Sequence, residues 1–549
     1  MAEADSTPST PRLAAAHQPR PTPPATATDL DALLAIQDFC IIGGGTGCNA
    51  VVGAFAGAKR ISYCLPVSDD GGSSSEIQRV LGGPALGDLR SRLVRLIPPS
   101  RANSPLDCIR RLLEYRLPGG PTVSHSAVKQ EWGDIVEGTH RLWRGIPGDR
   151  KETIRAFLVH FQSAVLKKAQ RGFNFKKASI GNLFLSGASL FLGSVPSAVF
   201  LFQSVTAISH DSIRIIPVIN TSSTVTIAAQ LEDGTIIAGQ SEISHPSVSS
   251  AGVAAPVVGV QEPVHGAEQD ATAPLLVNGQ THHGTGLVAP LAVRTEAIFP
   301  LTRATTPSFP EPPVLGAEED ESHADLPPSP DLSLHLSTAT DATGSEVGPY
   351  SPSGLTSFSA NQSHNLEFTK DASAIPPLPS RIQRIFYLST YGLEIHPRPN
   401  STFLQAIQDA TTLIFAPGSL YTSIVPCLIL RPVGDLIRTT KRVRHKILLL
   451  NASEDRETTG YDAVDFVVAI QEACRASRLV GAASDSNDVP PLEPSDIVTH
   501  VVYVRNGLIR VDEQELRGLG IEPIPVGPTP EGLFNDEVVR DALAQILST

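Results

Sequence analysis

Two adjacent aspartates in a glycine- and serine-rich segment are the residues of this chain best suited to chemistry. Asp69 and Asp70 follow an apolar, strand-like run. Neighbouring carboxylates can hold Mg²⁺ through their oxygens or accept a proton from an attacking hydroxyl group. A helix N-cap is the alternative role for Asp70. We predict Asp69 and Asp70 as catalytic and metal-binding residues, and as phosphate-binding residues those that follow them: Gly71, Gly72, Ser73 and Ser74.

An earlier glycine-rich segment indicates a phosphate site. The apolar run Phe39 to Ile42 leads into GGGTG. Its glycines allow a ligand to approach the backbone and present N–H groups to it, and the dipole of a following helix stabilises a phosphate. The alternative is a tight turn between strand and helix. The predicted nucleotide- and phosphate-binding residues here are Gly43, Gly44, Gly45, Thr46 and Gly47.

Three further loops rich in Gly, Ser, Thr or Asp follow other predicted strands. They are Asn220 to Thr224, the segment PGSLYTS, and the segment NASEDRETTG. The carboxyl ends of the strands in an open parallel sheet face one crevice, where such folds bind ligands. We therefore expect five loops to converge on one polar site. In PGSLYTS the predicted contacts to a second phosphate or a ribose are Gly418, Ser419, Thr422 and Ser423.

Alternating strand-like and helix-like segments predict an α/β fold of the Rossmann-like type, in which helices flank a parallel sheet. We expect a helix at Ala50 to Ala58, a helical cap at about 100–175, a hairpin at 224–239, and a final strand at Val498 to Val504. The predicted organisation is a disordered tail at 1–35, a first part of the Rossmann-like domain at 36–246, an insert at 247–380 and a second part at 381–549.

The insert is predicted to be disordered because residues 251–380 hold 17 prolines and 15 acidic but only 3 basic residues. This stretch accounts for nearly all of the formal net charge of −13. The rest of the chain has no block of basic residues that favours a nucleic acid partner. The uncharged run Ala178 to Ser209 resembles a membrane span, but Pro196 and several small residues favour two short buried helices and no membrane partner.

The six cysteines form no C-x-x-C pair, which is typical of reduced thiols, and we expect a cytoplasmic protein. The segment Gly45 to Ala50 also fits the dinucleotide fingerprint G-x-G-x-x-A. Asp69 lies 22 residues after Gly47, where a partner for an NAD ribose is expected. An NAD-dependent oxidoreductase is therefore one alternative.

The motifs IGGGTG, SDDGGSSSEI, GDLRSRL, IGNLFLSGA and APGSLYTSIVP occur in this order. Together they resemble the 2-phospho-L-lactate transferase (CofD) family, which includes the gluconeogenesis-factor-type (YvcK) proteins. The resemblance covers about 39–239 and 381–511 and looks closest to the long eukaryotic members. It implies a Rossmann-like fold with a helical cap.

The resemblance also implies an activity, the transfer of a phospholactyl-like group from a GDP-linked donor to a hydroxyl acceptor, a deazaflavin in the transferases, with Mg²⁺ and release of GMP. It assigns Asp88 and Arg90 to the donor phosphate and Asn182 to a ligand contact from the cap. The alternative within the family is a UDP-sugar-binding metabolic regulator, whose Gly-Ser-rich loop after paired acids this chain shares. The expected partner is thus a GDP- or UDP-linked small molecule. No tightly bound organic cofactor is expected, and a homodimer is left open.

Overall fold

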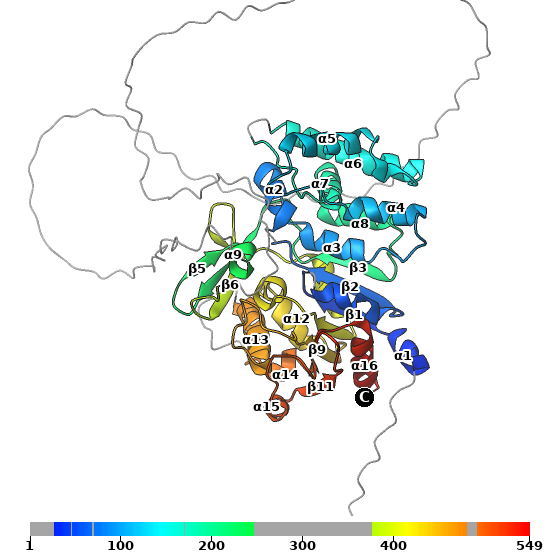
Figure 1. Ribbon diagram of the computed structural model, residues 1–549. Coiled ribbons are helices and arrows are strands. Elements are labelled where there is room, and N and C mark those ends of the chain that lie inside the picture. Colours follow the sequence, from blue (N-terminus) through cyan, green and yellow to red (C-terminus); the bar gives the residue numbers. More distant parts are fainter. Residues whose placement is uncertain are drawn as a thin grey trace, which may run out of the picture. The chain divides into compact units, whose positions relative to one another are not determined.

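The computed structural model describes residues 27–45, 47–68, 71–168, 171–245, 376–479 and 491–548. Its centre is a seven-stranded parallel sheet with the strand order β11-β10-β9-β8-β1-β2-β3 (Figure 1). The predicted α/β fold, with helices flanking a parallel sheet, is confirmed. The strands are β1 (Asp38–Ile42), β2 (Arg60–Leu65), β3 (Ile213–Pro217), β8 (Thr412–Phe415), β9 (His445–Leu449), β10 (His500–Val504) and β11 (Glu522–Val526).

Strand β1 is the point at which the order of the sheet reverses. It pairs in parallel with β2 on one side and with β8 on the other, so that Ile42 lies opposite both Cys64 and Phe415. All five residues of β1 are buried because helices cover both faces of the sheet. Ligands of open α/β sheets bind outside the carboxyl ends of the strands at such a reversal. The fold therefore directs attention to the loops that follow β1 and β8.

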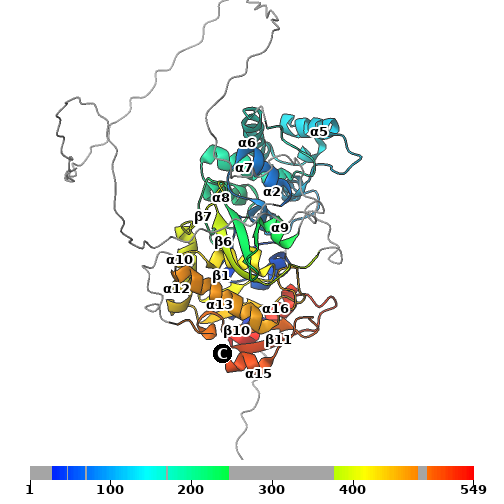
Figure 2. The ribbon, with the colours of Figure 1, turned by 90° about the vertical axis from the view of Figure 1, so that its left-hand side faces the viewer.

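A second sheet is antiparallel. Two of its strands precede residues 246–375 in the sequence, and the other two follow them. Its strand order is β5-β4-β6-β7, and Ala229 on β4 pairs with Ile385 on β6. The predicted hairpin is present as β4 and β5. Helix α9 contacts β4, and Figure 2 shows it beside this sheet. The bounds are β4 (Thr226–Leu231), β5 (Ile236–Ala238), β6 (Ile382–Leu388), β7 (Glu394–Ile395) and α9 (Gln240–Ser244).

Helices connect the strands of the parallel sheet and cover it. The segment after β1 is a 3-10 helix, η1, where the sequence predicted an ordinary helix over Ala50 to Ala58. The bounds are α1 (Ala27–Leu34), η1 (Gly47–Phe55), α2 (Gly72–Leu81), α3 (Gly87–Arg95), α10 (Ser401–Asp409), η4 (Leu420–Ile424), α11 (Val425–Leu428), α12 (Val433–Thr439), α13 (Ala463–Leu479), α14 (Pro494–Ile497), α15 (Glu513–Gly518) and α16 (Asp536–Leu547).

A group of helices lies beside the edge strand β3 (Figure 1). It fills the region predicted as a helical cap and extends into the uncharged run, which folds as two short helices, α7 and α8, as predicted. Gly187 allows α7 to approach the backbone of Phe157 on α6 so closely that a Cβ atom would meet its carbonyl oxygen. The bounds are α4 (Pro105–Glu114), α5 (His125–Glu137), η2 (Arg141–Trp143), α6 (Gly148–Leu166), α7 (Ile180–Leu192) and α8 (Val195–Val205).

Within the described ranges, no single helix has both the length and the apolar character needed to cross a bilayer. The segments Leu420–Leu428 and Val433–Thr439 meet those criteria only as a pair, which is bent by 78°.

Three further sequence predictions differ from the structure. Residues 1–35 were expected to be disordered throughout, but α1 forms within them, and Leu34 is fully buried. Residues 376–380, predicted as insert, belong to the described part. Val498 to Val504 was expected to be the final strand, yet β11 follows it. Pro523 and Pro525 concealed β11, and they are tolerated because β11 is an edge strand. Most of the predicted insert lies outside the described residues.

Candidate functional site

The glycine loop after β1 meets the loop after β8 at the carboxyl edge of the sheet. A Cβ atom on Gly47 would lie 2.8 Å from the carbonyl oxygen of Pro417, and one on Gly418 would lie 3.5 Å from that of Gly44. The two loops approach this closely because β1 and β8 are neighbours, although they are far apart in sequence. The structure therefore brings together two of the loops that the sequence predicted to converge.

Asp88, in the first turn of α3, is a buried carboxylate beside the glycine loop. Its Oδ1 accepts a hydrogen bond of 2.9 Å from the backbone N–H of Gly45, whereas Oδ2 has no partner within the described residues. A side chain at Gly44 would collide with Oδ2. Burial raises the pKa of Asp88, although the Gly45 N–H and the charge of Arg92 lower it.

Arg92, one helical turn after Asp88 on α3, is a buried cation whose charge acts on Asp88. Its side chain is 1% exposed, and its guanidinium group lies 4.9 Å from the centre of the Tyr63 ring. Its three guanidinium nitrogens have no hydrogen-bond partner among the described residues, but its charge counteracts the rise in pKa that burial causes at Cys48 and Asp88. An unpaired buried cation is costly unless a negative group offsets it. Arg92 therefore stabilises the ionised form of Asp88 and favours negative charge in its surroundings.

A second cluster connects α2, α3 and α7. Nε of Arg90 donates to Oδ1 of Asn182 over 3.1 Å, and the Asn182 amide nitrogen donates to the Ser73 hydroxyl over 2.8 Å. Asn182 and Ser73 are both buried. Three residues predicted to contact the ligand thus hold one another, and α3 carries both Arg90 and Asp88.

The loop after β8 is held in place by the loop after β9. The side chain of Asn451 accepts from the N–H of Gly418 over 3.0 Å and donates to the carbonyl oxygen of Gly418 over 2.8 Å. This reciprocal pair fixes the peptide groups on both sides of Gly418, whose φ of +148° favours glycine.

Glu457 fixes the next turn of the same loop from a fully buried position. Its Oε2 accepts from the backbone N–H groups of Tyr421, at 2.9 Å, and Thr422, at 3.2 Å. Its Oε1 accepts from the hydroxyls of Thr422, at 2.6 Å, and Ser244. Burial, followed by the charge of Asp455, raises the pKa of Glu457 to about 7.

The other predicted site residues differ in how exposed they are and in whether their polar groups are already hydrogen-bonded. The Thr422 hydroxyl is committed to Glu457, whereas Gly418 and Ser419 are partly exposed. Gly72 begins α2, Gly71 is its N-cap, and Ser74 is buried. The N–H groups of Gly43 and Gly45 donate to Cys64 and Asp88, so these two are already engaged. Three predicted residues lie outside the described ranges: Thr46, Asp69 and Asp70.

The structure therefore does not describe the two residues, Asp69 and Asp70, that were predicted to bind magnesium. Among the described residues, no three side chains of His, Cys, Asp or Glu are grouped so as to hold a metal ion. The unpartnered Oδ2 of Asp88 is the one observed feature that suits a hard cation, because Mg²⁺ takes oxygen ligands.

Comparison with known families identifies the class of protein that this fold and site define. Residues 39–525 match the family described as 2-phospho-L-lactate transferase CofD, and the chain belongs to this family. The resemblance predicted from the motifs is confirmed.

Individual relatives come from yeast and bacteria. The Saccharomyces cerevisiae protein YNL011C is 31% identical over 489 residues, which cover 87% of this chain and 92% of the yeast protein. The gluconeogenesis factor of Bacillus subtilis is 29% identical over 153 residues, or 28% of this chain and 45% of that protein. A crystal structure of a UPF0052 family member from Bacillus halodurans aligns with a TM-score of 0.49 and 16% identity over 92% of this chain and 98% of that chain.

Sequence reasoning missed Arg92, Asn451 and Glu457. Asn451 and Glu457 lie in the segment NASEDRETTG, which was recognised as one of the converging loops although none of its residues was assigned a role. Arg92 lies in the GDLRSRL motif, four residues after Asp88. This helical spacing was the available signal, because it places both side chains on one face of α3.

Proposed function

We propose that the protein is a transferase of the 2-phospho-L-lactate transferase type, which binds a GDP-linked donor at the carboxyl edge of the parallel sheet. The observation that carries this proposal is the close contact of the glycine loop with the loop after β8 at the reversal of strand order. Glycine loops at this position let a phosphate approach the backbone and the adjoining helix N-terminus. Because the N–H groups of Gly43 and Gly45 are engaged, the start of η1 would be the main backbone donor here. Family membership supports the same reaction class.

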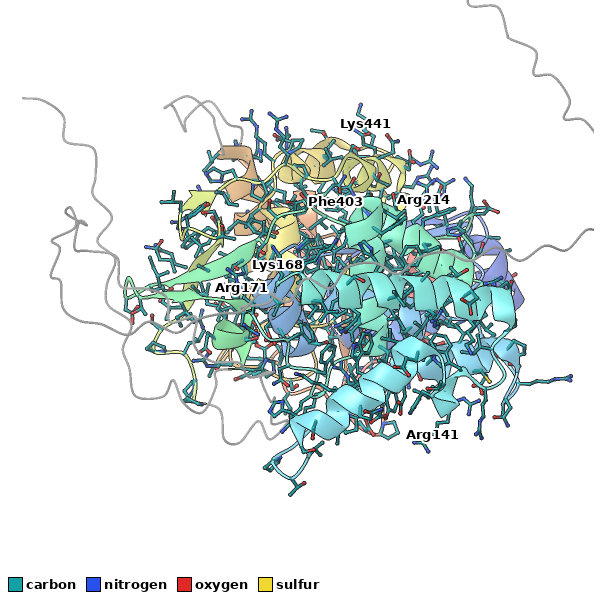
Figure 3. All side chains as sticks on the ribbon, turned by 90° about the horizontal axis from the view of Figure 1, so that it is seen from above. Arg141, Lys168, Arg171, Arg214, Phe403 and Lys441 are labelled. Carbon is teal, nitrogen blue, oxygen red and sulfur yellow. The ribbon has the colours of Figure 1, made fainter. Side chains whose placement is uncertain are left out.

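Positive charge around α2 supports an anionic ligand. The segment between α6 and α7 carries Lys167, Lys168, Arg171, Lys176 and Lys177. Figure 3 shows Lys168 and Arg171 close together near the end of α6. This segment packs against α2, since the N–H of Asn174 donates to Glu76 over 2.6 Å. Together with buried Arg92, these cations favour the approach of a phosphorylated molecule.

In the proposed reaction, the acceptor hydroxyl oxygen forms a bond to the phosphorus of the phospholactyl-like group in the donor. The bond from that phosphorus to the bridging oxygen breaks, and GMP leaves with the electron pair. Asp70 or Asp69 takes the hydroxyl proton. Bound Mg²⁺ would supply charge stabilisation for the phosphoryl group, with Asp69, Asp70 and Asp88 as its ligands. Arg90, oriented by Asn182, would bind the donor phosphate.

A second candidate function is a regulator that binds a UDP-linked sugar without turning it over. The similarity of part of this chain to bacterial proteins named gluconeogenesis factor favours this function. The Gly-Gly-Ser-Ser sequence after the paired aspartates also favours it. The NAD-dependent oxidoreductase stays a prediction from the fingerprint alone.

Ligand-induced thermal stabilisation tests nucleotide binding. We expect GDP or a UDP-sugar to raise the melting temperature of the protein, and Gly45→Val to abolish that shift, because Gly45 has a φ of +69° and lies in the loop contact. Gly120→Val is the matched control, since Gly120 also has a positive φ but lies in the segment between α4 and α5. Absence of stabilisation by GDP, UDP-sugars and NAD alike would refute nucleotide binding.

Turnover separates the transferase from the regulator. Asp70→Asn should reduce turnover by orders of magnitude while nucleotide binding falls far less, since the metal and the base act mainly in the transition state. The assay uses GDP-linked donors with a panel of hydroxyl acceptors and measures GMP release. No GMP release with any acceptor, together with tight binding of a UDP-sugar, would favour the regulatory function instead.

A further inference from the structure

A cavity of about 390 Å³ lies away from the loops after β1 and β8. It is bounded by the end of α2, the second half of α7, the start of α8 and the loop after β3. Its apolar wall includes Leu81 and Leu190, and its polar wall includes Ser186, Ser189 and Asn220. This volume falls within the range of pockets that hold small molecules. None of the described residues of the glycine loop or of the loop after β8 lines it, whereas Asn220 belongs to the loop after β3 that the sequence predicted to converge on the polar site.

Ser186 gives the cavity an unsatisfied polar group. Its side chain is 3% exposed, and its hydroxyl has no hydrogen-bond partner among the described residues. A serine inside a helix usually donates to a carbonyl oxygen one turn earlier, but the Ser186 hydroxyl does not. Buried hydroxyls are nearly always hydrogen-bonded in native proteins, so an orphaned one that borders a cavity points to a missing partner.

The lining also restricts the charge of that partner. None of the described residues that line the cavity is charged; the polar ones are serines, a threonine and an asparagine. A phosphate or carboxylate would lose its hydration there without gaining a compensating cation. A neutral molecule with hydroxyl groups can exchange hydrogen bonds with Ser186 and Asn220, and its apolar part can pack on Leu81 and Leu190.

We propose that this cavity is a second ligand site, which binds an uncharged small molecule with at least one hydroxyl group and an apolar portion. The Ser186 hydroxyl hydrogen-bonds to it. The site lies one helical turn from the hydrogen bond between Asn182 and Ser73, because Ser186 follows Asn182 by four residues on α7 and Ile77 follows Ser73 by four on α2. The two ligands therefore occupy separate but adjoining positions.

The test uses the full chain and a fragment set of uncharged hydroxylated aromatics and glycosides. Each scaffold is matched to a version that carries a phosphate or carboxylate. Saturation-transfer NMR measures binding to the wild type, Ser189→Phe and Ser163→Phe. Ser189 is half-buried and lines the cavity, so phenylalanine there fills it, whereas Ser163 is exposed on α6 and serves as the control. We expect neutral fragments to bind the wild type and Ser163→Phe, and to lose binding at least tenfold in Ser189→Phe.

Ser186→Ala provides a second measurement that does not depend on a bulky substitution. It should weaken the binding of neutral fragments about fivefold without lowering the melting temperature, because the lost hydroxyl has no partner in the free protein. Retained binding in Ser189→Phe, equal binding of the anionic scaffolds, or no binding of neutral scaffolds to the wild type would overturn the proposal. Unchanged affinity in Ser186→Ala would overturn the role of that hydroxyl.

Discussion

Replacing Glu457 with glutamine should remove a pH dependence of stability that originates beside the proposed nucleotide site. The carboxylate is fully buried, and its pKa rises from 4.5 to about 7. Glutamine has the same shape. Its carbonyl oxygen can accept from the N–H groups of Tyr421 and Thr422, and its amide nitrogen can donate to the hydroxyls of Thr422 and Ser244. The loop after β8 is therefore expected to keep its conformation.

The sign and size of the effect follow from the pKa difference. Below pH 4.5 the carboxyl is protonated in both the folded and the unfolded protein. As pH rises toward 7, the unfolded form ionises while the folded form resists, so stability is lost. Each pKa unit is worth about 1.4 kcal/mol. The rise from 4.5 to about 7 therefore makes the wild type about 3 kcal/mol less stable relative to Glu457→Gln at pH 8 than at pH 4.5.

Urea denaturation of both proteins between pH 4.5 and pH 8 measures this difference. The half-buried pair His445 and His500 changes stability in the opposite direction, because partial burial lowers both pKa values, that of His500 to about 4. Its contribution is the same in both proteins and cancels. Glu454→Gln is the matched control, since Glu454 is exposed in the same loop. A difference between wild type and Glu457→Gln that stays constant across this pH range would refute the reasoning.

One substitution tests the packing at the site, and one segment replacement tests the role of the predicted insert. Gly44→Ala should destabilise the protein by about 1–3 kcal/mol, because its Cβ atom collides with Oδ2 of Asp88, whereas Gly148→Ala, with open space around it, should not. Adding Asp88→Ala should recover part of the stability lost in Gly44→Ala, and no recovery would contradict the collision. Replacing residues 251–372 with a short Gly/Ser linker should leave melting temperature and ligand affinity nearly unchanged, because closure entropy grows slowly with loop length; unfolding on deletion would show that the segment contributes structure.

The parallel sheet was predictable because it depends on local patterns, and the expected position of the site at its carboxyl edge follows from the sheet. A strand covered on both faces reads as a short apolar run, as Phe39 to Ile42 does, and a glycine- or serine-rich loop marks its end. Strand β11 was missed because two prolines in five residues argue against a strand, and only its edge position makes them acceptable.

The functional contacts were less predictable because they depend on which loops meet. A glutamate between Arg456 and Thr458 in a polar segment looks like a solvated residue, and only the fold shows that Glu457 is buried against Tyr421 and Thr422. Likewise, the sequence indicates that Gly45 presents an N–H group to a ligand, but not that Asp88 already accepts from it. Long-range partners of this kind leave no mark in local residue spacing.

The pairing of β1 with β8 has a consequence for the folding of the protein during its synthesis on the ribosome. Asp38 and its partner Thr411 at the start of these strands are 373 residues apart. At about 5–20 residues per second, roughly 20–75 s pass between the synthesis of one strand and the other. During that interval β1, an interior strand of the finished sheet, has an open apolar edge. Unpaired edges of this kind recruit other chains, so the nascent protein depends on chaperones or on rapid burial of β1 to avoid aggregation.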